Sequence, residues 1–341
     1  MIKSVTISDL RGIASAQLDG LTQLTILTGP NGCGKSTVLD ALLIAASPSP
    51  GAALGMAVQR RPETWNGARW VVRAGGAAAV SRSRIQLGLS GGEQRTCWIE
   101  ADQPYADLAT VLQQRGYPTP YLQLNHVVGV DDNHPRIVSR TAFAADNHYA
   151  SVVESPDDRP RLGHVRLIDP GISMSLVDAF SEVGRAGGRK SAEDGIRRLV
   201  PNFERLAIYT DEGTPTLYLE RDGLPAVPLG LAGDGIQGFV QIALQLGART
   251  DGLALIEEPE VYQHPRALQL TASAIHRAVQ AGRQVVLTTH SLELIDALVD
   301  GIDPDQLSLF NLHMTGGVIA YGRYSGAQVA AARHEIEADL R

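Results

Sequence analysis

The sequence predicts an α/β fold: a parallel core sheet interrupted by an antiparallel β insertion and a helical lobe. Three observations support this prediction. A glycine-rich segment lies between an apolar strand at 24–28 and an apolar helix at 38–46. Two further predominantly apolar strands, at 253–256 and 284–288, alternate with helices. Short runs of alternating apolar and polar residues fill the chain between 70 and 153, and such alternation is typical of antiparallel sheets.

The remaining elements follow from periodicity and from breakers. Residues 2–8 alternate as a strand, and the Ser/Pro/Gly cluster at 47–51 ends the first helix. Helical patterns are expected at 235–246 and 265–281. We therefore expect three domains: a discontinuous core of residues 1–50 and 206–341, a β-rich insertion of residues 51–168, and a helical lobe of residues 169–205.

Composition restricts the class of protein. The 341 residues carry 30 basic and 37 acidic side chains, and this net charge of −7 argues against nucleic-acid binding through overall positive charge. Two cysteines are too few for a disulfide framework or a four-thiolate zinc site. The N-terminus lacks the apolar core of a signal peptide, and no apolar run approaches the roughly 18 residues of a membrane span. We expect a cytoplasmic protein that does not enter a membrane.

The strongest motif is GPNGCGKST, a GxxxxGK[ST] pattern between a strand and a helix. Glycines let backbone N–H groups surround phosphates, and the start of the following helix favours negative charge. Lys35 is expected to pair with the β- and γ-phosphates of a nucleotide, and Ser36 to hold Mg²⁺. The expected nucleotide-binding residues of this loop are Gly29, Pro30, Asn31, Gly32, Cys33, Gly34, Lys35, Ser36 and Thr37.

Two adjacent carboxylates follow the strand at 253–256. In a phosphate-loop enzyme, one acid at this place holds Mg²⁺ and the next activates the attacking water. We assign Glu257 to the metal and Glu258 to the general base. The alternative is a solvated acidic turn.

A histidine follows the next apolar strand. His290 lies 32 residues after Glu258, at the C-terminal end of the strand at 284–288, where sheets of this kind bind ligands. We interpret His290 as a γ-phosphate contact, against the alternative of a structural histidine.

Together these motifs resemble those of ABC-type ATPase heads, in the branch that contains the SMC, RecF and OLD-like proteins. IEEPEVYQHP and LTTHSLELIDAL are most similar to the OLD-like ATPases of anti-phage defence. The resemblance implies ATP and Mg²⁺ as cofactors, Lys35, Glu258 and His290 as catalytic residues, and a homodimer that binds ATP between two heads. Glu257 stands where many ABC proteins have Asp, which affects the expected metal geometry.

In such dimers a signature loop from the opposing head completes the site, and two segments compete for this role. LSGGEQR at 89–95 matches the transporter signature, but Glu93 lies 165 residues before Glu258 and between two alternating strands. We therefore interpret 89–95 as a hairpin turn. The segment with Gly233, Asp234 and Gly235 opens an apolar helix 24 residues before Glu258, counted from Asp234, and we expect it to contact the nucleotide.

Four further expectations concern Arg11, Gln59, the residues ahead of the phosphate loop and an arginine-rich segment. Arg11 lies where SMC-like heads often carry a nucleotide-contacting arginine, and Gln59 is our candidate for a metal-sensing glutamine. Residues 1–28 contain no Phe, Tyr or Trp to stack on adenine, which disfavours a transporter subunit. Residues 58–95 carry seven arginines and two glutamates, net +5, with Trp65 and Trp70 among them. This segment is either a solvated face or a surface for nucleic acid, with contacts expected from Arg60, Arg61, Arg82 and Arg84.

The resemblance implies a sensor ATPase in anti-phage defence that controls a separately encoded effector, most simply a nuclease. The chain ends 51 residues after His290, which we read as too short for an appended nuclease domain, and long heptad arms are absent. A RecF-like or SMC-like DNA-binding ATPase of DNA repair is the alternative.

Overall fold

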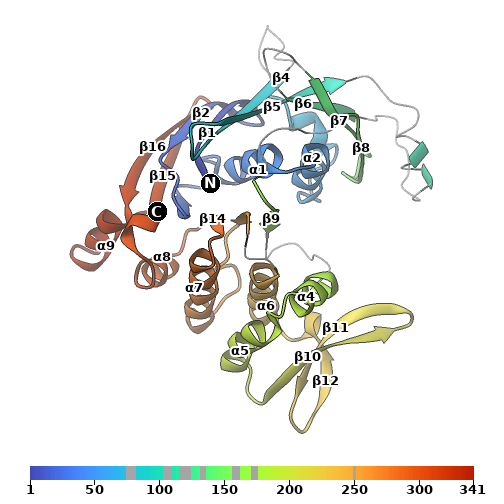
Figure 1. The fold of residues 1–341 in the computed structure, drawn as a ribbon, viewed down its shortest axis with the longest axis vertical. Helices are drawn as coiled ribbons and strands as arrows, with labels where there is room; N and C mark the ends of the chain where they lie inside the picture. Colours follow the sequence, from blue (N-terminus) through green and yellow to red (C-terminus); the bar gives the residue numbers. More distant parts are fainter. Residues whose placement is uncertain are drawn as a thin grey trace. The chain divides into compact units, whose positions relative to one another are not determined.

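The chain forms two compact units in a computed structural model (Figure 1). Unit 1 contains residues 1–21, 29–165 and 312–322, and unit 2 contains residues 22–28, 166–311 and 323–341. The structure describes residues 1–73, 82–102, 110–111, 113–114, 124–130, 136–155, 162–169, 176–248 and 251–341.

The sheet of unit 1 is almost entirely antiparallel. Its strand order is β8-β7-β6-β5-β4-β1-β2, and Val318 at the start of β16 pairs with β2 in parallel. The strands are β1 (Ile2–Leu10), β2 (Ile13–Asp19), β4 (Arg82–Leu89), β5 (Gln94–Asp102), β6 (Leu124–Val130), β7 (Arg136–Phe143), β8 (Tyr149–Val153) and β16 (Val318–Ser325). The antiparallel insertion predicted between 70 and 153 is confirmed by β4 to β8.

Two helices cover one face of this sheet. They are α1 (Lys35–Ala46) and α2 (Pro50–Gln59), followed by the 3₁₀ turn η1 (Gly67–Trp70). Alternate residues of β1 and β4, such as Val5 and Ile85, are fully buried beneath α1. The break between α1 and α2 is shorter than the Ser/Pro/Gly cluster at 47–51 suggests. Pro50 begins α2, because a proline in the first turn has no N–H that the helix needs.

The parallel sheet predicted for the core lies in unit 2. Its strand order is β15-β3-β14-β13-β9, and the pairs β15/β3, β3/β14 and β14/β13 are parallel. The strands are β3 (Leu24–Thr28), β9 (Val165–Ile168), β13 (Leu253–Ile256), β14 (Gln284–Thr288) and β15 (Leu307–Thr315), the last of which extends into unit 1. Every residue of β3, β13 and β14 is buried, which explains their continuous apolar sequences.

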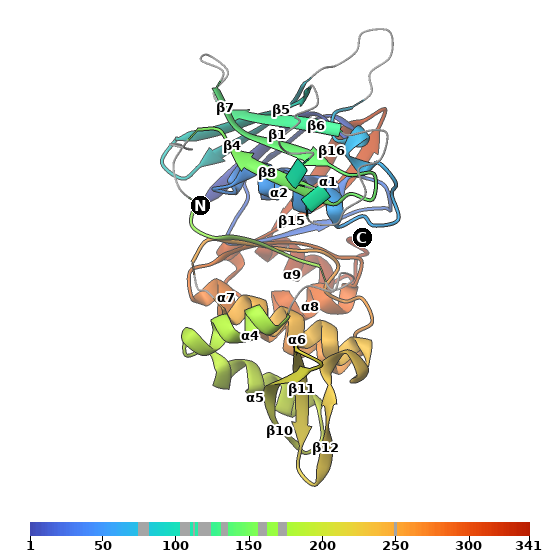
Figure 2. The same ribbon diagram turned by 90° about the vertical axis from the view of Figure 1, so that its right-hand side faces the viewer.

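The helices of unit 2 form two cores. One core packs α7 and α8 on the parallel sheet, and the other joins α4, α5 and α6 to a three-stranded sheet that projects beyond the helices (Figure 2). The elements are α4 (Leu176–Arg185), α5 (Arg189–Leu199), β10 (Phe203–Asp211), β11 (Thr214–Arg221), β12 (Leu224–Pro228), η2 (Leu229–Leu231), α6 (Asp234–Gly247), α7 (Pro265–Gln280), α8 (Leu292–Val299), η3 (Pro304–Gln306) and α9 (Gly326–His334).

Candidate nucleotide site

The glycine-rich loop of unit 1 has a backbone that only glycine adopts without strain. Gly29, Gly32 and Gly34 have φ values of +129°, +79° and +98°. A Cβ on Gly29 would lie 2.2 Å from the carbonyl oxygen of Leu312, and one on Gly34 would lie 2.9 Å from a methyl of Ile319. The loop is therefore a cradle that side chains would fill, and backbone N–H groups can face a phosphate there.

Lys35 is buried within this loop, with 6% of its surface exposed. Its Nζ donates to the carbonyl oxygens of Gly29 at 2.8 Å and Pro30 at 3.2 Å. Both acceptors are neutral, so these bonds orient the ammonium without cancelling its charge. A buried cation inside a glycine cradle fits the phosphates of a nucleotide.

The first turns of α1 lie over a buried ion cluster. Asp40 is 1% exposed; its Oδ1 accepts from Arg60 Nε at 2.8 Å, and its Oδ2 forms an ion pair with Arg11 Nη1 at 2.6 Å. Arg60 also donates to the carbonyl oxygen of Ser36 at 3.3 Å, and Arg11 to that of Ala57 at 2.7 Å. The cluster ties the β1–β2 turn and the end of α2 to the helix that follows the phosphate loop. The role expected of Arg11 toward the nucleotide stays a prediction.

The expected metal ligands are placed on their elements as follows. Ser36 and Thr37 lie half-buried in the first turn of α1, and Gln59 is exposed at the last position of α2. Among the described residues no cluster of three or more His, Cys, Asp or Glu side chains is suited to a metal. A metal there would rely on phosphate oxygens and on few protein ligands, as Mg²⁺ commonly does. The assignments of Ser36, Glu257 and Gln59 stay predictions.

The adjacent carboxylates of unit 2 differ in environment. Glu257 is 7% exposed, and its N–H donates to the carbonyl oxygen of Ile168 at 2.9 Å. Glu258 has a half-exposed side chain, and its N–H donates to Thr288 Oγ1 at 3.1 Å. Its φ of +40° is unusual for a residue with a side chain, and such strain is common at functional sites. The turn thus buries Glu257 and leaves the side chain of Glu258 accessible to solvent.

His290 and Glu258 meet at the carboxyl edge of the parallel sheet in unit 2. His290 Nε2 lies 3.6 Å from Glu258 Oε1, beyond hydrogen-bonding distance but close enough for both side chains to contact one ligand. The backbone N–H of His290 donates to Glu260 Oε1 at 2.6 Å. β13 and β14 are parallel neighbours, which explains how residues 32 apart come together.

Glu260 is a residue that the sequence reasoning missed. It links the turn after β13 to the residues after β14, through the N–H of His290. Burial raises the pKa of this carboxyl above its ordinary value of 4.5, and hydrogen bonds from His290, its own N–H and Thr289 oppose that shift only in part. The available signal was a third carboxylate two residues after Glu258 in IEEPE.

The two competing signature segments adopt different structures. Residues 89–95 form the turn between β4 and β5, with Gly91 and Gly92 at φ of +103° and +85°, so the predicted hairpin is confirmed. α6 begins at Asp234 as expected, and Gly233 precedes it with φ of +93° in open space. A Cβ on Gly235 would lie 2.7 Å from the carbonyl oxygen of Tyr262. Position 235 therefore requires glycine, and position 233 favours it because of its positive φ.

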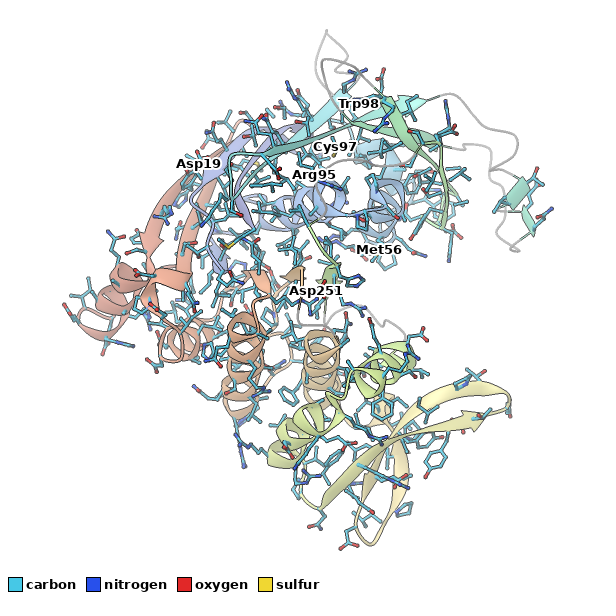
Figure 3. The ribbon with its side chains drawn as sticks, in the orientation of Figure 1. Asp19, Met56, Arg95, Cys97, Trp98 and Asp251 are labelled. Carbon is cyan, nitrogen blue, oxygen red and sulfur yellow. The ribbon has the colours of Figure 1, made fainter. Side chains whose placement is uncertain are left out.

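The arginine-rich segment is less basic at its surface than its sequence indicates. The prediction that Arg60 contacts nucleic acid is wrong, because its side chain is buried on Asp40. Arg95 is also buried and donates to the carbonyl oxygens that end α1 (Figure 3). Arg82 and Arg84 are exposed on β4, and Arg82 pairs with Glu100 at 2.8 Å. Arg61 is half-buried.

Comparisons of sequence identify relatives. Residues 24–296 match the family model described as "AAA domain, putative AbiEii toxin, Type IV TA system". The uncharacterized protein MJECL11 of Methanocaldococcus jannaschii is 31% identical over 112 residues, which are 32% of this chain and 98% of that protein. The uncharacterized protein MJECL10 of the same organism is 34% identical over 67 residues, which are 20% of this chain and 31% of that protein.

Comparisons of structure identify the fold. An SMC head bound to the C-terminal winged-helix domain of ScpA aligns with a TM-score of 0.56 and 14% identity, over 95% of this chain and 97% of that one. An SMC head from Pyrococcus furiosus, bound to the C-terminal domain of ScpA, aligns with a TM-score of 0.52 and 12% identity, over 99% of each chain. The fold is therefore that of an ABC-type ATPase head, as predicted. No helix in the described part of the chain is both long and apolar enough to cross a membrane.

Proposed function

The chain belongs to the AAA-domain family matched over residues 24–296, and from this premise we propose that it binds and hydrolyses ATP as a nucleotide-dependent homodimer. The observation that carries the proposal is the buried Lys35 ammonium, which neutral carbonyls hold inside a glycine cradle. A buried, uncompensated cation is costly unless an anion binds beside it. A triphosphate supplies that anion.

Glu258 acts as the general base in the proposed reaction. Its carboxylate takes a proton from water as the water oxygen attacks the γ-phosphorus, and the bond to the β-phosphate oxygen breaks to leave ADP. His290, 3.6 Å from Glu258, stabilises the γ-phosphate and donates toward its oxygens. Lys35 offsets charge on the same phosphates.

Mg²⁺ fits the donor set that we assign to it. The hydroxyl of Ser36 and the carboxylate of Glu257 are oxygen ligands, which this ion prefers, and Gln59 is a third candidate. When bound, the ion would neutralise charge on the β- and γ-phosphates. The expected protein contribution is to fix these oxygens and to leave the remaining positions to phosphate and water.

The second copy completes the site in this proposal. Gly233, Asp234 and Gly235 open α6, and both Gly233 and Asp234 are exposed. Leu231, three residues before the helix, is 77% exposed and is thus available for contact with an opposing head. Backbone N–H groups at this helix start are suited to a γ-phosphate presented by the partner.

The biological role that we propose is a sensor ATPase in anti-phage defence, controlling a separately encoded effector, most simply a nuclease. The family description names a toxin–antitoxin system, which is in keeping with action alongside a second component. ScpA-bound SMC heads show that this fold is compatible with docking of a separate protein. Co-purification of a second protein, with ATP turnover unchanged by duplex DNA, supports this role. Stimulation of turnover by DNA without any partner would favour the repair-type alternative.

The experiment that tests the ATPase is Lys35→Ala. We expect turnover to fall on the order of 10²-fold or more, and ATP affinity to fall with it, because the ammonium contacts phosphate before and during reaction. Lys190→Ala is the matched control, since this lysine is exposed on α5. ATP binding and turnover at wild-type levels in Lys35→Ala would refute the assignment.

A further inference from the structure

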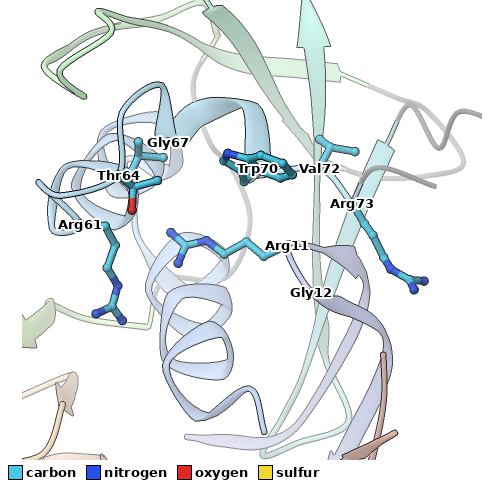
Figure 4. Close-up of a pocket in the computed structure, with 9 residues that line it drawn as sticks. Arg11, Gly12, Arg61, Thr64, Gly67, Trp70, Val72 and Arg73 are labelled. Atoms are coloured by element: carbon cyan, nitrogen blue, oxygen red, sulfur yellow. The ribbon is translucent and has the colours of Figure 1, made fainter. Parts of the chain in front are cut away.

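A pocket of about 520 Å³ lies in unit 1 beside the β1–β2 turn (Figure 4). Three of its nine lining residues are arginines, and none of the nine is acidic. Figure 4 shows the Trp70 ring and the Arg11 side chain in the middle of this lining, with Arg61 and Thr64 to one side and Arg73 to the other. The remaining lining residues are Gly12, Val58, Gly67 and Val72. The pocket combines an aromatic surface with arginine side chains, one of which, Arg11, is paired with Asp40 on α1.

The walls of this pocket are fixed by hydrogen bonds. The N–H of Arg11 donates to the carbonyl oxygen of Val71, and that of Arg73 to the carbonyl oxygen of Asp9, each at 2.9 Å. These bonds pair the segment after Trp70 with the β1–β2 turn.

The opposite wall depends on one buried side chain. The Asn147 amide donates to the carbonyl oxygens of Arg61 at 3.1 Å and Thr64 at 2.6 Å, and accepts from the N–H of Gly67 at 2.7 Å. Asn147 has no exposed surface. The backbone around the pocket is therefore fixed by the fold.

Trp70 is 60% exposed although its neighbours are well ordered by these bonds. An indole that stays in water does not contribute the free energy that its burial would give, and tryptophan is enriched at binding surfaces. Its flat face suits a heteroaromatic ring, and the guanidinium groups of Arg61 and Arg73 suit an electron-rich ligand, whereas the guanidinium of Arg11 is paired with Asp40. A purine nucleotide has both properties.

The pocket shares its supports with the phosphate loop, all within unit 1. Arg11 binds Asp40 on α1, which begins directly after the loop. A Cβ on Gly34, in the loop, would lie 3.4 Å from Ile13, the residue that follows the β1–β2 turn. The turn therefore contacts the phosphate loop on one side and lines the pocket on the other.

We infer that this pocket holds the base of the nucleotide whose phosphates bind at residues 29–37, with Trp70 stacking on the base. The inference rests on the proposed function, and it adds a binding site for the base, which the sequence motifs do not contain. The aromatic residue missing ahead of the phosphate loop is thereby supplied by η1, after α2. Arg61 and Thr64 offer hydrogen bonds to the edge of the base or to the ribose.

The test separates the base from the phosphates. Dissociation constants are measured with Mg²⁺ for ATP and for inorganic tripolyphosphate, in the wild type and in Trp70→Ala, Trp70→Phe and Trp65→Ala. We expect Trp70→Ala to weaken ATP about tenfold and to leave tripolyphosphate unchanged, because stacking acts only on the base. Trp70→Phe should retain most of the ATP affinity. Trp65→Ala is the control, since Trp65 is similarly exposed but does not line the pocket.

The outcomes distinguish this inference from the proposed function. Wild-type ATP affinity in Trp70→Ala overturns the inference, and so does an equal loss of ATP and tripolyphosphate, which would indicate a structural role for Trp70. If either of these results is found while Lys35→Ala abolishes ATP binding, the inference is wrong but the proposed function is retained. If the wild type binds neither ATP nor tripolyphosphate, the proposed function and the inference are both wrong.

Discussion

Asp40 shows how one residue supports the nucleotide site without touching it. Its buried carboxylate compensates two guanidinium groups, of Arg11 and Arg60, and thereby ties α1 to the β1–β2 turn and to the end of α2. Removal of the carboxylate would leave two cations against a buried neutral group. The site therefore depends on a charge that the phosphate-loop motif does not contain.

Asp40→Asn should consequently destabilise the fold by about 3 kcal/mol, the range for removal of one partner of a buried ion pair. Glu100→Gln is the matched comparison, because the Arg82–Glu100 pair is exposed and such pairs contribute about 0–1 kcal/mol. Denaturant unfolding of both variants measures the difference. Equal effects of the two substitutions would show that Asp40 does not hold the cluster.

Glu260 leads to a prediction about pH. Burial raises the pKa of its carboxyl in the folded state above 4.5, so the folded protein binds a proton more readily than the unfolded chain does. This group therefore makes the protein less stable as pH rises from the ordinary carboxyl pKa through the raised value. Glu260→Gln should remove that loss and keep an acceptor for the His290 N–H. Thermal unfolding from pH 4 to 8 checks this, and parallel wild-type and variant curves would contradict it.

For single residues, the sequence predicts a role in the candidate site where the residue belongs to a local motif. The glycines of 29–34, Lys35 and the acid pair Glu257 and Glu258 are predicted in this way. Asp40, Glu260 and Trp70 could not be predicted, because their roles depend on partners distant in sequence, such as His290 for Glu260. The prediction for Arg60 was wrong for the same reason, because counting charges in the sequence does not show which side chains are buried.

The start of α6 and the β4–β5 turn are the two elements that compete for the proposed contact with a partner chain. Gly235 is a poor position for a test, because any side chain there would press on the carbonyl oxygen of Tyr262 within the same unit. Asp234 is exposed and begins the helix, so it can be replaced without such a clash.

Asp234→Arg should permit ATP binding but reduce turnover at least tenfold, because a bulky cation would obstruct the approach of the opposing head. Glu93→Arg, on the exposed β4–β5 turn, should stay within a few-fold of wild type. Steady-state ATPase assays and binding measurements on both variants provide the comparison. The reverse pattern would restore residues 89–95 as the signature loop.

Elements with strong periodicity or unbroken apolar sequence are predicted well. β13 and β14 have the predicted bounds, and α7 ends one residue before its predicted end. The helix α2 escaped prediction because Pro50 and Gly51 read as breakers, although a proline at a helix start is favourable. Strand order in the sheets was beyond reach, since pairing such as β15 with β3 joins distant segments.

On the scale of the whole molecule, the charges argue against nucleic-acid binding through overall positive charge. The net charge is −7, and two of the seven arginines in residues 58–95 are buried on partners within unit 1. We expect Arg82→Gln with Arg84→Gln to leave ATP turnover unchanged, with or without duplex DNA. Lower DNA affinity and a shallower salt dependence in this double variant would instead show that β4 contacts phosphates.

The central claim is that Glu258 activates water in an ATP-driven dimer, and Glu258→Gln tests it most directly. Light scattering and ATP turnover are measured in the same sample, with ATP and with ADP, and exposed Glu204→Gln serves as control. We predict that Glu258→Gln binds ATP, loses turnover by on the order of 10²-fold or more, and has a dimer's mass with ATP but not with ADP, because binding favours association and slow hydrolysis preserves it. Normal turnover, or the same mass with either nucleotide, would contradict the account.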